Sequence, residues 1–411
     1  MPGGSRYRCV ALAIAVLALA AAARADVAGA VLRVGTSGDY KPFSFHDAAG
    51  GFTGFDVAVA RRLSADLGRP LSFVPFQWPD MAAQLRAGAF DIAMSGVTVR
   101  ADRAVQMTFT RPYAVTGAVV VIRVRDRQRF RRLDDFDRTG VRIAVNRGGH
   151  LEQVARRRFA QATLMAVSDN EALPGMLLHG RADAVVSEEL EAQTWPVAKF
   201  VVLGPFTRDR KAYAMPREAI DLVHRVDDWL AAREADGWLN GQRRQWLGQR
   251  AMETPQQAGF EALVAAIDLR LQLMPLAAAV KRREHMPIED PAQEARVLDH
   301  VRTAAAPAGL SADDVAGVFR VQIELAKAIE GGGAEMAPAD LQLADVRAAV
   351  AAASDQIIRE LARCQLWVSD ARLAQTLDRA VRAGLTVPDL PPAGVDALIA
   401  ALHHIRASGN P

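Results

Sequence analysis

Two patterns of apolar and polar positions divide the chain near residue 248. Before this point, short apolar runs alternate with stretches in which apolar residues recur every three or four positions, as on one face of a helix. The runs that predict strands are Val31–Val34, Leu71–Val74, Phe90–Met94, Ala118–Ile122, Arg142–Val145, Ala184–Val186 and Phe200–Leu203. Strands that alternate with helices indicate parallel sheets covered by helices. We therefore expect an α/β body over residues 26–247.

Beyond the polar segment Glu253–Gln256 the strand pattern ends, and Ala-, Leu- and Arg-rich helical patterns continue to about Ile405. Glycine and proline mark the turns of this part, at Pro287, Pro307–Gly309, Gly331–Gly333 and Pro388–Pro392. The pattern predicts an all-helical domain over residues 257–411. A linker at residues 248–256 joins it to the α/β body.

The first 25 residues carry a different pattern. Arg6 and Arg8 precede an apolar segment, Val10–Ala22, and Ala23–Ala25 supplies a small-residue cleavage site before Asp26. This arrangement is typical of a secretory signal peptide and is too short for a transmembrane anchor. We expect no second apolar run of membrane length, and hence a periplasmic protein that leaves the membrane after cleavage.

Removal of this segment changes the charge balance. It takes away three arginines and no acidic residue, which leaves 47 basic and 47 acidic side chains. A chain without net charge lacks the basic surface that neutralises phosphate backbones, so we expect no nucleic-acid partner. Cys364 is the one cysteine that remains, so no intrachain disulfide can form after cleavage.

The segment Phe90–Tyr113 carries the first candidate binding residue. It reads as a buried strand, a Ser-Gly turn and a short helix that contains Arg103. Ligands of open α/β sheets lie beyond the carboxyl ends of the strands, and a guanidinium can hold a carboxylate through two parallel hydrogen bonds. Arg103 is therefore a candidate carboxylate anchor. The alternative is an ordinary surface arginine that follows a strand.

Two further segments place polar groups at strand ends. Asn146–His150 leads from a strand into a helix, and its glycines free backbone N–H groups that can bind an anion at the helix N-terminus. Asp183–Glu191 is a strand that ends in three carboxylates. Glu188 and Glu189 can also be interpreted as ordinary polar residues at the end of a strand, and Trp78 as a core residue.

Together these segments resemble the type II periplasmic solute-binding proteins, and within them the periplasmic cyclohexadienyl (prephenate or arogenate) dehydratases. The resemblance covers about residues 29–247 and rests on TSGDYKPFSF, GGFTGFDVA, FQWP, FDIAMSG with Arg103, the NRGG loop and the SEELE pattern. It implies a two-lobed fold in which Arg103 anchors a substrate carboxylate and Glu191 is the general acid. The pocket residues that it implies are Asp39, Trp78, Ser95, Thr98, Gly148, Gly149, His150 and Glu188. His150 departs from the family, which usually has a hydroxyl residue there.

In the helical part, two cations occupy an apolar stripe. The stripe comprises Leu263, Ile267, Arg270, Met274, Ala277 and Lys281. Arg270 and Lys281 return to one face about 16 Å apart along the axis, and we expect Pro275 to kink the helix between them. Because unpaired cations are rarely buried, this pair could bracket a small dianion. The alternative is an internal ion pair with Asp290 or Glu294.

This stripe and the segments after it resemble the exported AroQ-type chorismate mutases, over about residues 257–405. The matching residues are Arg270, Lys281, Pro287–Asp290, Glu294, Val318–Phe319, Gln322–Ile323, Glu330 and Arg347. The resemblance implies that Arg270 and Arg347 clamp carboxylates and that Lys281 and Glu330 donate to the ether oxygen. Asp290 and Glu294 then lie on the side of the substrate hydroxyl. Two positions depart from the family: Gln293 usually is arginine, and Ala326 often carries a hydroxyl or an amide.

From the two resemblances we expect a bifunctional exported enzyme that needs no cofactor or metal. One domain would turn chorismate into prephenate, and the other prephenate into phenylpyruvate or arogenate into phenylalanine. One alternative is a non-catalytic receptor for an amino acid or aromatic acid with a helical appendage. Another is a helical domain that only senses or docks. The pattern leaves the oligomeric state open.

Overall fold

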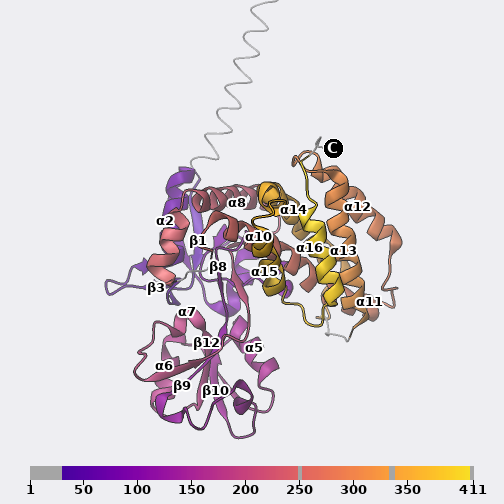
Figure 1. Ribbon diagram of the computed structural model, residues 1–411. Coiled ribbons are helices and arrows are strands. Elements are labelled where there is room, and N and C mark those ends of the chain that lie inside the picture. Colours follow the sequence, from indigo (N-terminus) through magenta and orange to yellow (C-terminus); the bar gives the residue numbers. More distant parts are fainter. Residues whose placement is uncertain (1–29, 249–251, 333–337, 408–411) are drawn as a thin grey trace, which may run out of the picture.

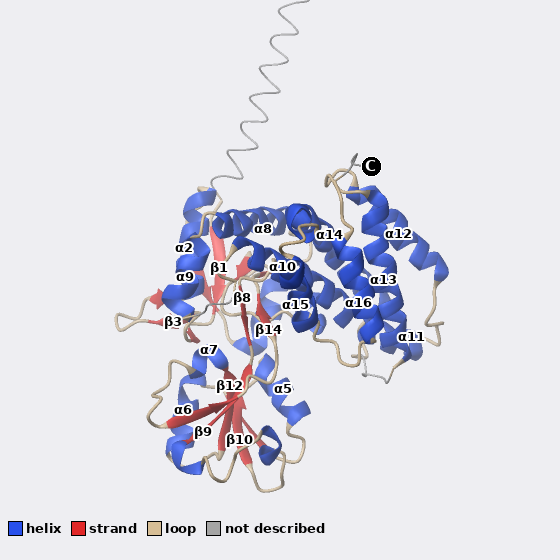
Figure 2. Cartoon of the chain, viewed as in Figure 1, coloured by secondary structure: helices blue, strands red, loops and turns tan. Residues whose placement is uncertain are grey.

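The computed structural model describes residues 30–248, 252–332 and 338–407. The chain forms two α/β lobes and a helical domain, which packs beside the first lobe (Figure 1). Strands are confined to the two lobes in the described part of the chain (Figure 2). A two-lobed α/β fold followed by a helical domain is therefore confirmed. The predicted signal peptide, residues 1–25, lies outside the described residues.

The first lobe contains a mixed five-stranded sheet of β1 (Leu32–Thr36), β5 (Leu71–Pro75), β6 (Ile92–Ala93), β7 (Met107–Phe109) and β15 (Ala214–Pro216). The strand order is β5-β1-β6-β15-β7. A small antiparallel sheet comprises β2 (Asp39–Tyr40), β3 (Ser44–His46) and β4 (Phe52–Thr53). The helices of this lobe are α2 (Phe55–Leu67), α3 (Met81–Arg86), α4 (Ala101–Ala104), α8 (Ile220–Ala235) and α9 (Trp238–Gln242).

The second lobe contains another five-stranded sheet, formed by β9 (Ala118–Arg123), β10 (Arg142–Asn146), β11 (Thr163–Val167), β12 (Ala184–Glu188) and β13 (Phe200–Leu203). The strand order is β11-β10-β12-β9-β13. Its helices are α5 (His150–Arg158), α6 (Leu173–Leu178) and α7 (Glu189–Ala192). The sheet is apolar on both faces, since two separate clusters of buried side chains pack against it.

Two short strands connect the lobes. β8 (Ala114–Thr116) precedes β9, β14 (Asp209–Lys211) follows β13, and the two strands pair antiparallel. The chain therefore crosses between the lobes twice, through one two-stranded ribbon. Movement of one lobe against the other has to be absorbed in such a connection.

All seven sequence-predicted strands are present, with bounds that differ by one or two residues at most ends. The expectation of parallel sheets is wrong in part. β9 is antiparallel to β12 and β13, and β15 is antiparallel to β6 and β7. The periodicity of a strand records which of its faces are buried but not the direction of its neighbour, so the pattern could not show this.

The helical domain comprises α10 (Pro255–Gln272), α11 (Met274–Arg283), α12 (Pro291–Ala305), α13 (Ala312–Gly331), α14 (Leu343–Val368), α15 (Ala374–Gly384) and α16 (Pro392–His403). α10 starts where it does because the Thr254 hydroxyl accepts from the Gln257 N–H at 3.2 Å, while the Gln257 side chain accepts from the Thr254 N–H. The helix predicted over Gln257–Arg283 is interrupted at Leu273, just before Pro275, which cannot donate a backbone hydrogen bond.

The combined span Pro255–Arg283 is long and apolar enough to cross a membrane by length and composition. The expectation that no second apolar run reaches membrane length is therefore wrong. Most of its apolar window, 89%, is buried inside the protein. A helix that is apolar on all sides is what the centre of a helical core requires.

The helical domain and the first lobe share one hydrophobic core. The first lobe contributes Phe76, Leu85, Phe90, Val97, Met107 and Phe109, among others. The helical domain contributes Leu269, Leu273, Leu276, Val280 and Val346. Each such side chain stabilises the packing by about 1.5–3 kcal/mol when it is fully buried. The two bodies are thus packed as one unit and are not merely tethered.

Candidate active sites

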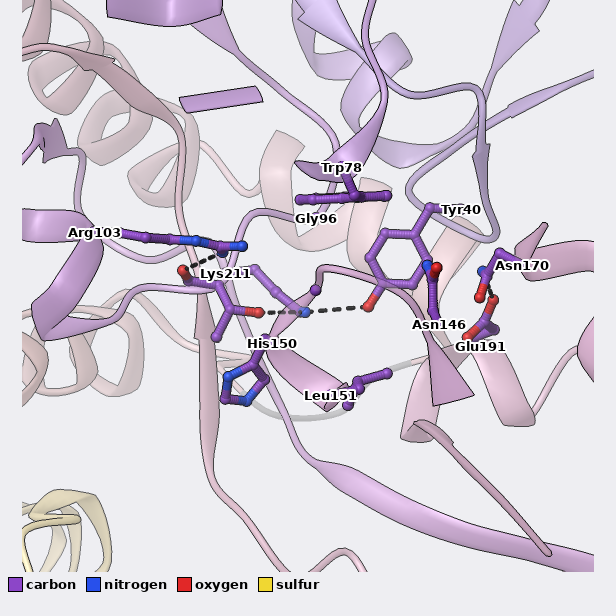
Figure 3. Close-up of a pocket in the computed structure, with 12 residues that line it drawn as sticks. Tyr40, Trp78, Gly96, Arg103, Asn146, His150, Leu151, Asn170, Glu191 and Lys211 are labelled. Carbon is purple, nitrogen blue, oxygen red and sulfur yellow. Dashed lines mark hydrogen bonds between the residues drawn. The ribbon is translucent and has the colours of Figure 1, made fainter. Parts of the chain in front are cut away.

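A pocket between the two lobes encloses about 420 Å³ of empty space, part of it open to solvent. Its lining comes from both lobes and from the ribbon: Tyr40, Trp78, Gly96, Thr98, Arg103, Asn146, Gly149, His150, Leu151, Asn170, Glu191 and Lys211. Figure 3 shows Arg103 at one end, the Glu191–Asn170 pair at the other, and Lys211 between them. The pocket therefore sets cationic groups against a carboxyl group across one small space.

Arg103 lies on the short helix α4, and its side chain is buried. Its Nη1 donates to the Thr98 carbonyl at 3.1 Å, and the guanidinium lies 5.9 Å from the centre of the Trp78 ring. Burial lowers the pKa of Arg103 to about 9, and the nearby Arg100 acts in the same direction. A carbonyl and an aromatic ring thus orient a cation that is still charged at neutral pH.

Glu191 lies on α7, directly after β12, and is 5% exposed. The Ser187 hydroxyl donates to its Oε2 at 2.7 Å, and the Asn170 amide donates to its Oε1. Burial raises the pKa of Glu191 to about 7 although both hydrogen bonds oppose the shift. Near neutral pH, Glu191 is therefore protonated in a large fraction of the molecules. A general acid requires this protonated form.

Lys211, on β14, is a pocket residue that the sequence analysis missed. Its Nζ donates to the Thr98 Oγ1 at 2.9 Å and to the Tyr40 hydroxyl oxygen at 3.2 Å (Figure 3). Burial lowers its pKa, while Glu188 and Asp209 oppose this shift. Glu188 is itself fully buried, and burial raises its pKa to about 8. The ribbon thus places a second cation in the pocket.

His150 and Asp209 join the second lobe to the ribbon. The His150 Nε2 lies 3.0 Å from the Asp209 Oδ2, and both side chains are buried or nearly so. Burial lowers the pKa of His150, with Asp209 opposing. Burial alone would raise the pKa of Asp209, but His150, Lys211 and Thr207 lower it overall. His150 therefore lies beside a carboxylate and also borders the pocket.

Four predicted pocket residues lie near the pocket without lining it. The Asp39 carbonyl accepts from the Asn170 amide at 3.3 Å, and Ser95 bonds the Ser37 hydroxyl at 2.8 Å. Glu188 is buried at the end of β12. The fourth is Gly148, at the predicted anion site.

One N–H group of the predicted anion site at the Gly148–Gly149 turn is already engaged. The Gly148 N–H donates to the Glu152 Oε2 at 2.6 Å, so a carboxylate of the following helix satisfies this donor. Gly149 still borders the pocket. The sequence could not show that the Glu152 side chain, four residues after Gly148, would accept this hydrogen bond at the start of its own helix.

A second pocket, with about 1100 Å³ of empty space that is partly open, lies within the helical domain. Every residue predicted for the mutase site borders it: Arg270, Lys281, Asp290, Gln293, Glu294, Glu330 and Arg347. Apolar side chains complete its lining, among them Met274, Ile288, Val297, Ile323, Val346 and Val350. Helices α10 to α14 thus enclose one space rimmed by charged groups.

Arg270 is buried in this pocket, 3% exposed. Its Nε donates to the Ser354 Oγ at 3.3 Å, and its guanidinium lies 5.4 Å from the centre of the Phe319 ring. Its Nη1 has no hydrogen-bond partner within the described part of the chain. Burial lowers the pKa of Arg270 to about 10, so it remains a cation at neutral pH. A buried cation with an unused donor is suited to an anionic ligand.

Lys281 and Glu330 form an ion pair at the pocket wall. The Lys281 Nζ donates to the Glu330 Oε2 at 2.7 Å and to the Ile288 carbonyl at 2.7 Å. Burial raises the pKa of Glu330, although Lys281 opposes the shift. Both groups remain able to donate a hydrogen bond to a ligand oxygen, the lysine through its third N–H and the carboxyl group when protonated.

The rim of this pocket carries more exposed pairs. The Arg347 Nη2 donates to the Asp290 Oδ2 at 3.1 Å, and Lys327 lies 3.1 Å from Glu294. Gln293 accepts from Arg296 at 2.8 Å. The alternative in which Asp290 or Glu294 pairs with the buried stripe is therefore wrong, because Lys281 pairs with Glu330 instead.

Comparison with known proteins places the first part of the chain. Residues 32–249 match the model of the bacterial extracellular solute-binding proteins, family 3. The chain belongs to this family. Residues 261–331 match chorismate mutase type II, so this family 3 protein carries a mutase domain after its lobes. The resemblances stated from the sequence are thereby confirmed, and family membership supports export of the chain.

Its relatives include both an enzyme and receptors. It is 34% identical to the cyclohexadienyl dehydratase of Pseudomonas aeruginosa over 262 residues, 61% of this chain and 97% of that one. It is 29% identical to the L-cystine-binding protein TcyJ of Escherichia coli over 222 residues, 53% of this chain and 82% of that one. Similarity to the first part of this family 3 protein is thus compatible with catalysis and with simple binding.

Solved structures show the same division. An ancestral amino acid-binding protein, AncCDT-1, described as a precursor of cyclohexadienyl dehydratase, superposes with a TM-score of 0.51 at 32% identity and covers 53% of this chain and 95% of its own. A binding component from Wolinella succinogenes, complexed with lysine, has a TM-score of 0.51 at 25% identity, with 53% and 96% covered. What separates an enzyme from a receptor on this fold must lie in the pocket residues.

Proposed function

We propose that this family 3 protein is a periplasmic enzyme that catalyses two consecutive reactions. The helical domain converts chorismate to prephenate. The α/β lobes remove water and carbon dioxide from prephenate to give phenylpyruvate, or from arogenate to give phenylalanine. The observation that carries the proposal is Glu191, a buried carboxyl group with a pKa near 7 that faces Arg103 and Lys211 across the pocket. A receptor has no need for an acid at this position.

In the proposed dehydratase reaction, Arg103 holds the side-chain carboxylate of the substrate, and Trp78 packs against its ring. Glu191 donates its proton to the ring hydroxyl, which leaves as water. The ring carboxylate leaves as carbon dioxide, and the electron pair of its bond to the ring completes the aromatic system. Ser187 and Asn170 hold the acid in place. Closure of the lobes excludes water and keeps this proton transfer enclosed.

In the proposed mutase reaction, one carbon–oxygen bond of chorismate breaks as one carbon–carbon bond forms, with no proton transfer in the step. Arg270 and Arg347 bind the two carboxylates and hold the substrate in its folded conformation. Lys281 and Glu330 donate to the ether oxygen, where negative charge grows in the transition state. The unused Arg270 donor and the Lys281–Glu330 pair support these roles.

A second candidate function for the lobes is that of a receptor for an amino acid or an aromatic acid. The similarity to the L-cystine-binding protein and to the lysine complex favours it. Arg103 would serve a receptor equally well as a carboxylate anchor. The two functions differ in the fate of the ligand, which a receptor releases unchanged.

One assay tests the proposal. Chorismate is added to the purified mature protein, residues 26–411, and the amounts of chorismate, prephenate and phenylpyruvate are followed together. We expect chorismate to fall, prephenate to rise and then fall, and phenylpyruvate to accumulate. If prephenate accumulates without phenylpyruvate, arogenate is added separately and phenylalanine is measured. Absence of both products would reject the dehydratase and favour the receptor. Unchanged chorismate, with added prephenate still consumed, would reject the mutase.

A further inference from the structure

The ribbon strand β14 presents its three charged side chains to two different sites. Asp209, Arg210 and Lys211 are all buried, each 5% exposed or less. Successive side chains of a strand point to opposite faces. Lys211 lines the pocket between the lobes and contacts Thr98, and Asp209 contacts the pocket residue His150. Arg210 points the other way, into the helical domain.

Every nitrogen of the Arg210 guanidinium is bonded to the helical domain. Its Nε donates to the Glu261 Oε1 at 2.7 Å, its Nη1 to the Asp268 Oδ2 at 2.6 Å, and its Nη2 to the Gly384 carbonyl at 2.6 Å. A side chain at Gly384 would place its Cβ 3.0 Å from the Arg210 Nη2 and 2.5 Å from a Val264 methyl group. The helical domain is therefore shaped to receive this arginine.

The backbone around Arg210 also holds the pocket's cation anchors. The Val99 N–H donates to the Arg210 carbonyl at 2.9 Å, and Thr98 forms a β-bridge with Lys211. The Thr98 carbonyl in turn accepts from the Arg103 guanidinium. A shift of β14 would therefore move Lys211 and Thr98, and through Thr98 it would move Arg103.

We propose that Arg210 is a positioning residue of the dehydratase pocket, through which the helical domain completes the site that lies between the lobes. Glu261, Asp268 and the Gly384 carbonyl fix Arg210, and Arg210 fixes the strand that carries Asp209 and Lys211. The fused helical domain is then a structural part of the dehydratase as well as the source of its substrate. This inference rests on the proposed dehydratase activity.

The test compares Arg210→Met with Arg217→Met in the full-length protein. Arg217 forms another ion pair between the same two bodies, with Asp345 at 3.1 Å, but lies outside the ribbon and both pockets. We expect Arg210→Met to raise the KM for prephenate roughly ten- to hundredfold, because small displacements of binding groups are costly. Arg217→Met should leave this KM unchanged. A merely destabilised protein would lose kcat through its inactive fraction and keep its KM.

Two further measurements cover a variant that folds poorly or a protein without turnover. Arg210→Lys keeps one cation but not the three-way fork, so its KM should lie between those of the wild type and Arg210→Met. Hydrogen–deuterium exchange of residues 207–213 requires no activity and should rise in Arg210→Met but not in Arg217→Met. Equal KM and equal exchange in the two methionine variants would overturn the inference. Absent turnover of both prephenate and arogenate in the wild type would reject the proposed function, and exchange alone would then decide whether Arg210 positions this strand.

Discussion

The two pockets use similar side chains for different chemical tasks. The pocket between the lobes is small, about 420 Å³, and buries Glu191 and Lys211 almost completely. The helical pocket is larger, about 1100 Å³, and its Arg347–Asp290 pair remains 39% and 30% exposed. A proton donor needs the enclosure that shifts its pKa, whereas a rearrangement without proton transfer needs only well-placed charges.

The two pockets also differ in the parts of the chain that supply their charged groups. The helical pocket draws its charged groups from a single domain, in which helix spacing sets their positions. The pocket between the lobes collects Arg103, Glu191 and Lys211 from two lobes and a connecting ribbon. Its geometry therefore depends on how the two lobes and the connecting ribbon are held relative to one another. If the two sites are as separate in chemistry as in construction, substitutions in one should leave the reaction of the other unchanged.

The largest separation should come from Glu191→Gln. Glutamine keeps the size of the side chain and the Ser187 and Asn170 contacts but cannot donate an acidic proton. We expect the rate of phenylpyruvate formation from prephenate to fall by about 10²–10⁴, with chorismate consumption unchanged. Glu189→Gln, two residues earlier on α7 and outside the pocket lining, is the matched control and should retain both rates. A rate of phenylpyruvate formation within about twofold of the wild-type rate would show that another group is the acid.

The converse change is Lys281→Ala. It removes the cation proposed to donate to the ether oxygen and leaves Glu330 without its partner. We expect the rate of chorismate consumption to fall by about 10²–10³, while added prephenate is converted at the wild-type rate. Loss of both activities would contradict the separation and indicate that the helical domain had unfolded, which circular dichroism of the variant can check.

The helical pocket could be predicted from the sequence because helices repeat. Arg270 and Lys281 share a face through steps of three and four. Glu330 and Arg347 lie on two long regular helices, α13 and α14. Each of these residues borders the pocket. The interruption at Leu273 did not separate the pair, since both residues border the same pocket.

The pocket between the lobes could be predicted only in part. Arg103 and Glu191 follow strands whose apolar pattern is plain. Asp209–Lys211, in contrast, are three charged residues in succession, which is typical of a surface loop. They are buried because two lobes and the helical domain meet at this strand, and no local pattern records such a meeting. Alternation of the flanking apolar residues was too short to reveal β14.

A change of pH should separate the rates of the two reactions less than the substitutions do. Burial raises the pKa of Glu191 to about 7, and the protonated form is the active one. The dehydratase kcat/KM should therefore be highest below pH 7 and fall by about tenfold per unit above it. Chorismate consumption should not report Glu191, which takes no part in it. Its own decline as the pH rises should reflect Glu330, which donates only when protonated and whose pKa is raised by burial. Rate profiles with each substrate between pH 5 and pH 9 measure both, and a dehydratase rate that rises above pH 7 would contradict an acid role.

The smallest effect should come from Asp290→Asn at the rim of the helical pocket. Asparagine preserves the N-cap of α12, where the Asp290 Oδ1 accepts from the Gln293 N–H at 3.0 Å, but removes the charge that pairs with Arg347. Exposed ion pairs contribute about 1 kcal/mol or less, so the KM for chorismate should change by no more than about fivefold. Because Asp290 competes with a substrate carboxylate for Arg347, the KM should fall rather than rise.

The difference in KM between Asp290→Asn and the wild type should shrink at higher salt concentration, because salt screens charges at the exposed rim. The effect of Lys281→Ala should persist, because Lys281 lies deeper in the pocket wall. A salt-independent rise in KM would instead place Asp290 in direct contact with the substrate.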